Sequence, residues 1–132
     1  MLAFIRILLL LCFIVVASSI GLLICLVRPF HRDNVGLFSR WYGKASWILG
    51  LKVEVRYHPD VKAAMPCVFV ANHQNNYDLF TISGSLIKGT VTIGKKSLKF
   101  IPFFGQLYWL SGNILIDRNN KSRAVGTMQG AV

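Results

Sequence analysis

The chain has 132 residues, of which 54% are hydrophobic, and its 15 Lys and Arg residues outnumber 5 Asp and Glu residues, giving a net charge of +10. This length suits a single domain, and a mean hydropathy of +0.52 with so much positive charge is unusual for a soluble one. Basic residues scattered among aromatic and aliphatic ones favour membrane lipid as the partner and argue against nucleic acid. The three cysteines lack CxxC spacing, so we expect neither a disulfide framework nor a metal site.

The N-terminal segment is apolar enough to enter a membrane. Residues 7–27 carry no charged side chain, and a helix of this length would be roughly 30 Å long, enough to cross the bilayer core. The heavier basic flank follows this segment and predicts that the rest of the chain faces the cytoplasm. A single spanning helix is the favoured interpretation. The alternative is a pair of shorter helices that dip into one leaflet, broken near Ser18-Ser19 or Gly21.

A second helix is expected directly after this segment. Residues 35–49 place Leu37, Trp41, Trp47 and Ile48 among basic and small residues. This pattern is typical of an amphipathic helix that lies along the headgroups with Trp at the interface, and equally of a helix that faces a protein core. We therefore assign residues 1–50 to a membrane-spanning or interfacial helical segment.

The periodicity changes from residue 51 onward. Residues 51–57 alternate with period two, which predicts a half-buried strand, and residues 67–71 form the continuous apolar run of a strand buried on both faces. The remaining expected elements are a helix and two short strands, over residues 77–87, 90–94 and 113–116. This alternation predicts an α/β domain over residues 51–132, with flanking helices on a mixed, largely parallel sheet.

Six polar residues stand between the second predicted strand and the helix, in the stretch ANHQNNYD over residues 71–78. Ligand sites in open α/β sheets gather at the carboxyl ends of strands. With a loop between them, His73 and Asp78 can converge, so that Asp78 accepts the Nδ1 proton of His73 and leaves Nε2 free as a general base. Taken alone, a His-x4-Asp pattern is more often structural, with the aspartate simply favouring a helix N-terminus.

The longer motif resembles a known family. Residues 72–78 are similar to the NHx4D first block of the glycerolipid acyltransferases, and residues 112–118, GNILIDR, resemble that family's second block. Residues 94–98 and 101–105 resemble its connecting region. The resemblance covers nearly the whole chain and is closest to the bacterial lysophosphatidic acid acyltransferases.

The resemblance implies a reaction and a site. The reaction is acyl transfer from acyl-CoA or acyl carrier protein to the 2-hydroxyl of 1-acyl-glycerol-3-phosphate, which forms phosphatidic acid for phospholipid biosynthesis. His73 takes the role of the base and Asp78 orients it. The acceptor's phosphate, which requires fixed cations, falls to Arg118 and Lys95. No metal and no cofactor besides the acyl donor is implied, and the expected location is the bacterial inner membrane.

Two further substrate-binding candidates belong to the same blocks, Asn72 in the first and Gly112 in the second. The family's third block, Phe-Pro-Glu-Gly-Thr, and its fourth block do not occur, so we expect the N-terminal part of a longer domain. Two other functions stay open: acyl transfer to another acceptor, such as glycerol-3-phosphate or another lysolipid, and a non-catalytic module that binds anionic lipid.

Overall fold

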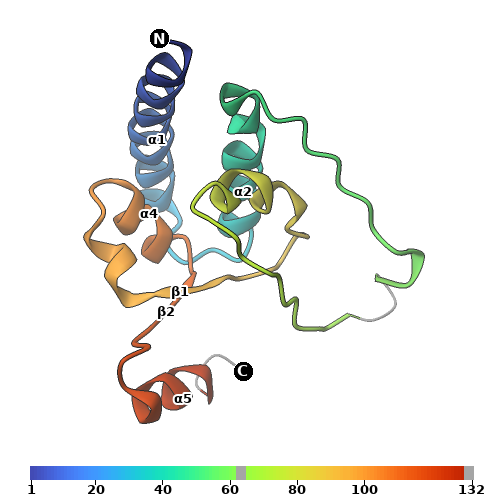
Figure 1. The fold of residues 1–132 in the computed structure, drawn as a ribbon. Coiled ribbons are helices and arrows are strands. Elements are labelled where there is room, and N and C mark those ends of the chain that lie inside the picture. The colour runs from blue at the N-terminus through green and yellow to red at the C-terminus, as the bar shows by residue number, and fades with distance from the viewer. Residues whose placement is uncertain (62–64, 130–132) are drawn as a thin grey trace.

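The computed structural model describes residues 1–61 and 65–129. It begins with α1 (Leu2–Val27), a continuous α-helix of 26 residues (Figure 1). This helix runs unbroken through Ser18-Ser19 and Gly21, so the alternative of two shorter helices is wrong. The Ser19 hydroxyl donates to the Val15 carbonyl at 2.7 Å, which keeps a polar side chain satisfied within the helix. Within the described part of the chain, α1 alone is long and apolar enough to cross a membrane, with a mean hydropathy of 3.0.

One face of α1 packs against the rest of the protein through small residues. Ser18, Gly21 and Cys25 are buried and share a face because they are three or four residues apart. At Gly21 the packing is so close that an added Cβ would lie 2.8 Å from Leu107 and 3.2 Å from Phe38. The opposite face exposes apolar side chains along the whole helix, which suits contact with lipid.

The second helix, α2 (Asn34–Lys44), continues into the 3-10 turn η1 (Ala45–Leu49) and runs back along α1. The Ser18 hydroxyl lies 2.7 Å from the Tyr42 hydroxyl, and the Arg6 guanidinium covers Gly50 just beyond η1. The helix expected over residues 35–49 therefore exists, and its buried side includes Phe38 and Tyr42. This packing favours the core-facing interpretation, although Trp47 remains 71% exposed.

Two predicted strands do not form. Residues 51–57 and 67–71 run as extended chain without a strand partner among the described residues, so both predictions are wrong for this structure. Val68 and Val70, expected to be buried, are 87% and 92% exposed. Alternation and apolarity indicate which side chains a strand could bury, but a strand needs a second backbone for its hydrogen bonds. Between the two segments lies one short 3-10 turn, η2 (Pro59–Val61).

The helix expected over residues 77–87 is shorter than predicted. It consists of α3 (Asp78–Thr81) followed by the 3-10 turn η3 (Ser83–Ser85). The Ser83 hydroxyl donates to the Leu79 carbonyl, and the Ser85 hydroxyl donates to the Ile82 carbonyl at 2.7 Å. This turn packs on α2 so closely that a Cβ added at Gly43 would overlap the backbone of Gly84.

The C-terminal part contains the sheet. Strands β1 (Ile93–Lys95) and β2 (Ile114–Ile116) pair in parallel, with Lys95 opposite Ile116. The 3-10 turn η4 (Lys96–Phe100) and helix α4 (Phe104–Leu110) form the crossover between them, and α5 (Lys121–Gln129) follows β2. The strand predicted over residues 113–116 and the parallel α/β class are confirmed, whereas the strand predicted over residues 90–94 forms later, at Ile93–Lys95.

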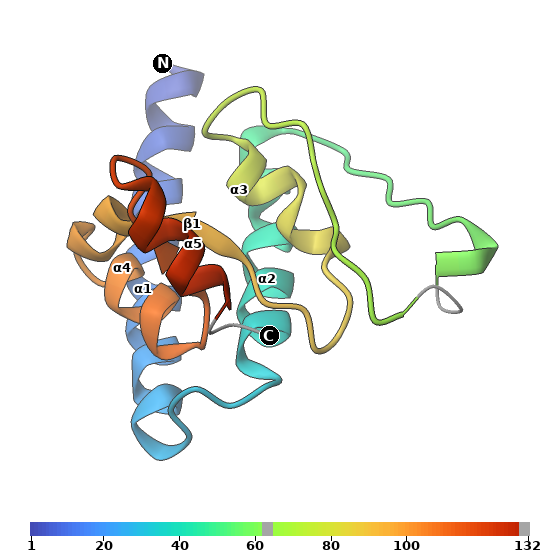
Figure 2. The same ribbon diagram turned by 90° about the horizontal axis from the view of Figure 1, so that it is seen from below.

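The hydrophobic core lies where α1, α2, α3 and α4 meet. Figure 2 shows α4 beside α1, and α3 lies against α2. At their junction the Tyr42 ring lies 6.2 Å from Phe80 of α3 and 5.5 Å from Phe104 of α4, measured between ring centroids. This aromatic cluster ties both the N-terminus of α3 and the β1–β2 crossover to the N-terminal helices.

Candidate active site

The turn before α3 brings His73 and Asp78 together. Nδ1 of His73 lies 3.2 Å from Oδ2 of Asp78, which is the arrangement that the sequence predicts. The His73 side chain is 71% exposed, whereas that of Asp78 is only 14% exposed. The imidazole is therefore open to a substrate, while the carboxylate behind it is shielded.

Local hydrogen bonds explain why the chain folds this way. The backbone N–H of Gln74 donates to Oδ2 of Asp78 at 2.7 Å, and that of Asn75 donates to the same oxygen at 3.2 Å. The Asn75 side chain in turn accepts from the N–H of Tyr77 at 2.8 Å. The bond between Asn75 and Tyr77 is an Asx turn, in which a side chain closes the loop that it belongs to. The polar run is thus a self-supporting turn that presents His73.

The electrostatics of the pair favour an ionised carboxylate. The pKa of Asp78 is held below its ordinary value, first by the backbone N–H of Asn75 and of Gln74 and then by His73. A carboxylate at Nδ1 selects the tautomer that carries its proton there, which leaves the Nε2 lone pair free. The turn can therefore accept a proton at Nε2 and stabilise the resulting cation.

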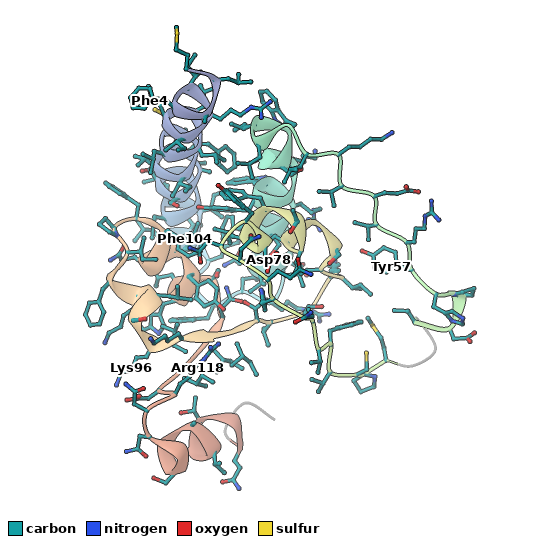
Figure 3. All side chains as sticks on the ribbon, viewed as in Figure 1. Phe4, Tyr57, Asp78, Lys96, Phe104 and Arg118 are labelled. Atoms are coloured by element: carbon teal, nitrogen blue, oxygen red, sulfur yellow. The ribbon has the colours of Figure 1, made fainter. Side chains whose placement is uncertain are left out.

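The two predicted phosphate-binding cations lie at the carboxyl ends of the strands. Lys95 ends β1, and Arg118 follows β2 by two residues. Their neighbours form an ion pair, with Nζ of Lys96 4.0 Å from Oδ2 of Asp117. Among the described residues no ion pair engages Lys95 or Arg118, and both are exposed. Figure 3 shows Lys96 and Arg118 near the strands and Asp78 at the start of α3.

A hydrogen-bond network, which the sequence does not predict, joins the amino ends of the two strands. Oδ1 of Asn113 accepts from the backbone N–H of Thr92 at 2.9 Å and from its hydroxyl at 2.6 Å. The amide group of Asn113 donates to the Tyr108 carbonyl at 3.1 Å and to the Ser111 hydroxyl at 2.9 Å. Every hydrogen-bonding position of this amide is filled. The only sequence signal was a polar residue directly before an apolar strand.

Tyr108 extends this network toward the cations. Its hydroxyl lies 2.7 Å from that of Thr92, and it must donate, because the Thr92 proton goes to Asn113. Burial is the main cause that raises the pKa of Tyr108, and the positive charge of Arg118 acts in the opposite direction. The neutral hydroxyl also covers Gly94, where an added Cβ would lie 2.7 Å from it.

The other two substrate-binding candidates, Asn72 and Gly112, differ in their surroundings. Asn72 is exposed and makes no side-chain hydrogen bond to the residues that the structure describes. Gly112 has φ +101 and follows α4 at the point where the chain turns into β2, so its conformation favours glycine. Roles in substrate binding stay predictions for both.

Two groups of candidates thus occupy separate segments. One comprises His73 and Asp78, and the other comprises Lys95 and Arg118, with no hydrogen bond or ion pair between the groups in residues 1–61 and 65–129. A cavity of about 950 Å³ is lined by Lys96 and Asp117, the chain neighbours of the second group, and by Trp109. The described residues contain no cluster of three or more His, Cys, Asp or Glu suited to a metal ion.

Comparisons with known proteins identify the family of the chain. The family model described as "Acyltransferase" matches residues 52–132, a range that contains both groups of candidates. The chain is 48% identical over 112 residues to the 1-acyl-sn-glycerol-3-phosphate acyltransferase of Escherichia coli, covering 85% of this chain and 46% of the relative. The relative of the same name in Haemophilus influenzae is 44% identical over 128 residues. The aligned region covers 97% of this chain and 53% of the Haemophilus protein.

More distant relatives extend the comparison to eukaryotes. The human 1-acyl-sn-glycerol-3-phosphate acyltransferase beta is 32% identical over 120 residues, which cover 89% of this chain and 42% of the human protein. The chain spans about half the length of the curated relatives it matches. No solved structure matches it at a significant level. From the match over residues 52–132 and the identity with these relatives, we conclude that the chain belongs to the Acyltransferase family.

Proposed function

We propose that this chain is part of a 1-acyl-glycerol-3-phosphate acyltransferase that transfers an acyl group to the 2-hydroxyl of lysophosphatidic acid and forms phosphatidic acid. The observation that carries the proposal is the hydrogen-bonded pair of His73 and Asp78, held within the matched range. The names of the most similar relatives support lysophosphatidic acid as the acceptor.

In the proposed reaction, Nε2 of His73 takes the proton of the 2-hydroxyl as its oxygen attacks the thioester carbonyl. The tetrahedral intermediate collapses, the carbon–sulfur bond breaks, and the imidazolium returns its proton to the departing thiolate. Asp78 stabilises the imidazolium through Nδ1 and fixes the plane of the ring. The substrate supplies the nucleophile, so no serine or cysteine of the protein needs to form an acyl intermediate.

Binding of the acceptor would rest on its phosphate. A phosphate dianion is recognised by fixed cations, and the guanidinium of Arg118 offers two parallel donors, whereas Lys95 offers a point charge. Anchoring the phosphate restricts the glycerol backbone, which raises the local concentration of its hydroxyl at His73. The donor is acyl-CoA or acyl carrier protein, and we propose no other cofactor.

We place the reaction at the bacterial inner membrane, with the site on the cytoplasmic side. Support comes from the apolar outer face of α1, from the basic residues that follow the helix, and from the bacterial relatives. A lysophospholipid acceptor resides in the bilayer, so an enzyme associated with the membrane would meet it there.

The test is an acyltransferase assay on membranes that contain the complete protein, with lysophosphatidic acid and acyl-CoA. His73→Ala should reduce the rate by about 10²–10⁴, the usual contribution of a general base. His58→Ala is a matched control, because Nδ1 of His58 also meets a carboxylate, Oδ2 of Asp60 at 3.4 Å, on a fully separate turn. Full activity of His73→Ala would exclude the proposed base.

Competing acceptors decide between the remaining functions. Glycerol-3-phosphate and other lysolipids, offered beside lysophosphatidic acid, should be acylated more slowly. A preference for glycerol-3-phosphate would replace the assigned acceptor while keeping the base. Lipid binding without any acyl transfer, in a correctly folded protein, would instead support the non-catalytic module.

A further inference from the structure

A second apolar surface lies beyond the end of α1, on the loop after this helix and on the crossover between β1 and β2. Three exposed aromatic residues belong to η4 and α4 or to the link between them, and a fourth lies in the loop after α1. We call these four the aromatic patch, and their exposed fractions are Phe30 53%, Phe100 73%, Phe103 46% and Trp109 52%. A protein surface in water rarely gathers so many large rings without a partner.

The patch is held in place by its own contacts. The rings of Phe30 and Trp109 meet edge to face, with centroids 5.4 Å apart. The backbone N–H of Phe30 donates to the Leu110 carbonyl at 2.8 Å, which joins the loop after α1 to the end of α4. Phe30 and Phe103 have φ values of 55° and 62°, a region that bulky residues seldom occupy. These contacts tie Phe30 to α4 and hold its ring against that of Trp109 on the surface.

Positive charge surrounds these rings. Nζ of Lys99 lies 4.9 Å from the centroid of the Phe100 ring, and Lys96 lies three residues before Lys99. On the other side, Arg32 follows Phe30 by two residues and is exposed. Lys96 is paired with Asp117, and Asp33, one residue after Arg32, is paired with Lys88 at 3.6 Å, so Lys99 and Arg32 supply the positive charge that no ion pair engages among the described residues. The surface thus combines aromatic rings with excess cations.

The patch is also continuous with α1. In the last turns of that helix, Leu23, Leu26 and Val27 are 65%, 73% and 86% exposed. Phe30 lies three residues after Val27. Because Phe30 touches Trp109, the apolar face of α1 extends through this loop onto α4. Rings with lysine and arginine at the end of an apolar helix are typical of the membrane interface, where the rings enter the headgroup region and the cations meet lipid phosphates.

We propose that the aromatic patch is a second membrane-docking surface, which inserts its rings among the headgroups of an anionic bilayer. This inference rests on the proposed membrane location, but not on the chemistry at His73. Lys95 is the last residue of β1, and η4, which ends in Phe100 of the patch, follows it directly. Docking would therefore hold that cation at the depth of the lipid phosphates, where an acceptor still seated in the leaflet could reach it.

Trp109 can report the docking directly. The complete protein is bound to vesicles of phosphatidylglycerol and phosphatidylethanolamine that carry bromine either near the headgroup or deep in the acyl chains. The signal is the part of the tryptophan fluorescence that Trp109→Phe removes, which excludes Trp41 and Trp47. We expect this part to be quenched mainly by the shallow bromines. No quenching, or equal quenching in vesicles of neutral phosphatidylcholine, would overturn the proposal.

Phe100 supplies an independent test with a matched control. Phe100→Ser should raise the KM for lysophosphatidic acid in anionic vesicles by roughly five-fold, since it removes an apolar contact with lipid, and leave the KM in detergent micelles unchanged. Phe100→Trp, which keeps an interfacial ring, should retain the original KM.

Other occupants of the patch predict different results. If the rest of the protein or a second copy covered it, Phe100→Ser would lower the unfolding temperature and raise the KM equally in micelles and vesicles. Loss of activity in His73→Ala with normal quenching of Trp109 would separate the two proposals, because docking would then persist without chemistry.

Discussion

Asp78 accepts three hydrogen bonds on one carboxylate oxygen, from His73, Gln74 and Asn75. Asp78→Asn keeps an oxygen for the two backbone donors, so the turn should persist, but it removes the negative charge that stabilises the imidazolium. We expect kcat to fall by about 10²–10⁴ with little change in the unfolding temperature. The measurement is kcat beside a thermal melt of the complete protein, and a kcat near that of the wild type would show that Asp78 serves only the turn.

The pH dependence separates the two members of the pair. The pKa of Asp78 is lowered in the folded protein, so its contribution to stability is present above the unfolded pKa and is lost only as the pH falls through the lower folded value. At pH 5 and above the carboxylate therefore stays ionised. Histidines take up a proton between about pH 8 and 5, which would remove the base. We expect kcat/KM to fall over this interval, and a flat profile with chemistry limiting would contradict the assignment.

The two neighbouring lysines provide a comparison at the phosphate site. Lys96 is drawn toward Asp117, at the 4.0 Å limit of an ion pair, whereas Lys95 has no such partner among the described residues. Lys95→Ala should raise the KM for lysophosphatidic acid about ten-fold or more, as expected for a lost charged hydrogen bond, while Lys96→Ala should change it less than about three-fold. Steady-state kinetics in micelles measures both, and the reverse order would assign the phosphate to Lys96.

At the scale of elements, the β1–β2 pair depends on the network around Asn113. Asn113→Leu keeps the side-chain size but leaves the Thr92 N–H and the Tyr108 carbonyl without these partners, which should cost about 1–3 kcal/mol of unfolding free energy. Tyr108→Phe removes a single donor and should cost about 1 kcal/mol. Urea unfolding of the complete protein measures both, and equal stability of all three proteins would mean that other contacts hold the strands.

The elements also show what the sequence could and could not predict. The pairing of His73 and Asp78 was predictable because the turn is closed by its own residues. The strands predicted at residues 51–57 and 67–71 do not form in the structure. The sequence could not show this, because strand formation depends on a partner elsewhere in the chain. Similarly, the helix over residues 77–87 was interrupted by tertiary packing, since the turn at Ser83–Ser85 fits closely against α2.

For the whole molecule, the outer face of α1 decides how the protein is held at the membrane. This face is apolar along its length, so hydrophobic burial rather than charge should dominate the association. We expect the complete protein to stay with the membrane fraction in high salt and to require detergent for its release. Recovery of most of the protein in a high-salt wash would instead indicate a mainly electrostatic attachment.

The contact between Gly43 and Gly84 has a consequence for where the reaction happens. Because a Cβ added at Gly43 would overlap the backbone of Gly84, the turn after α3 lies directly on the backbone of α2. Asp78 at the start of α3, and with it His73 in the preceding turn, is therefore positioned relative to a helix that packs on α1. Under the proposed function, this backbone contact sets the depth of His73 relative to the membrane. Neither ionic strength nor lipid charge would alter that depth.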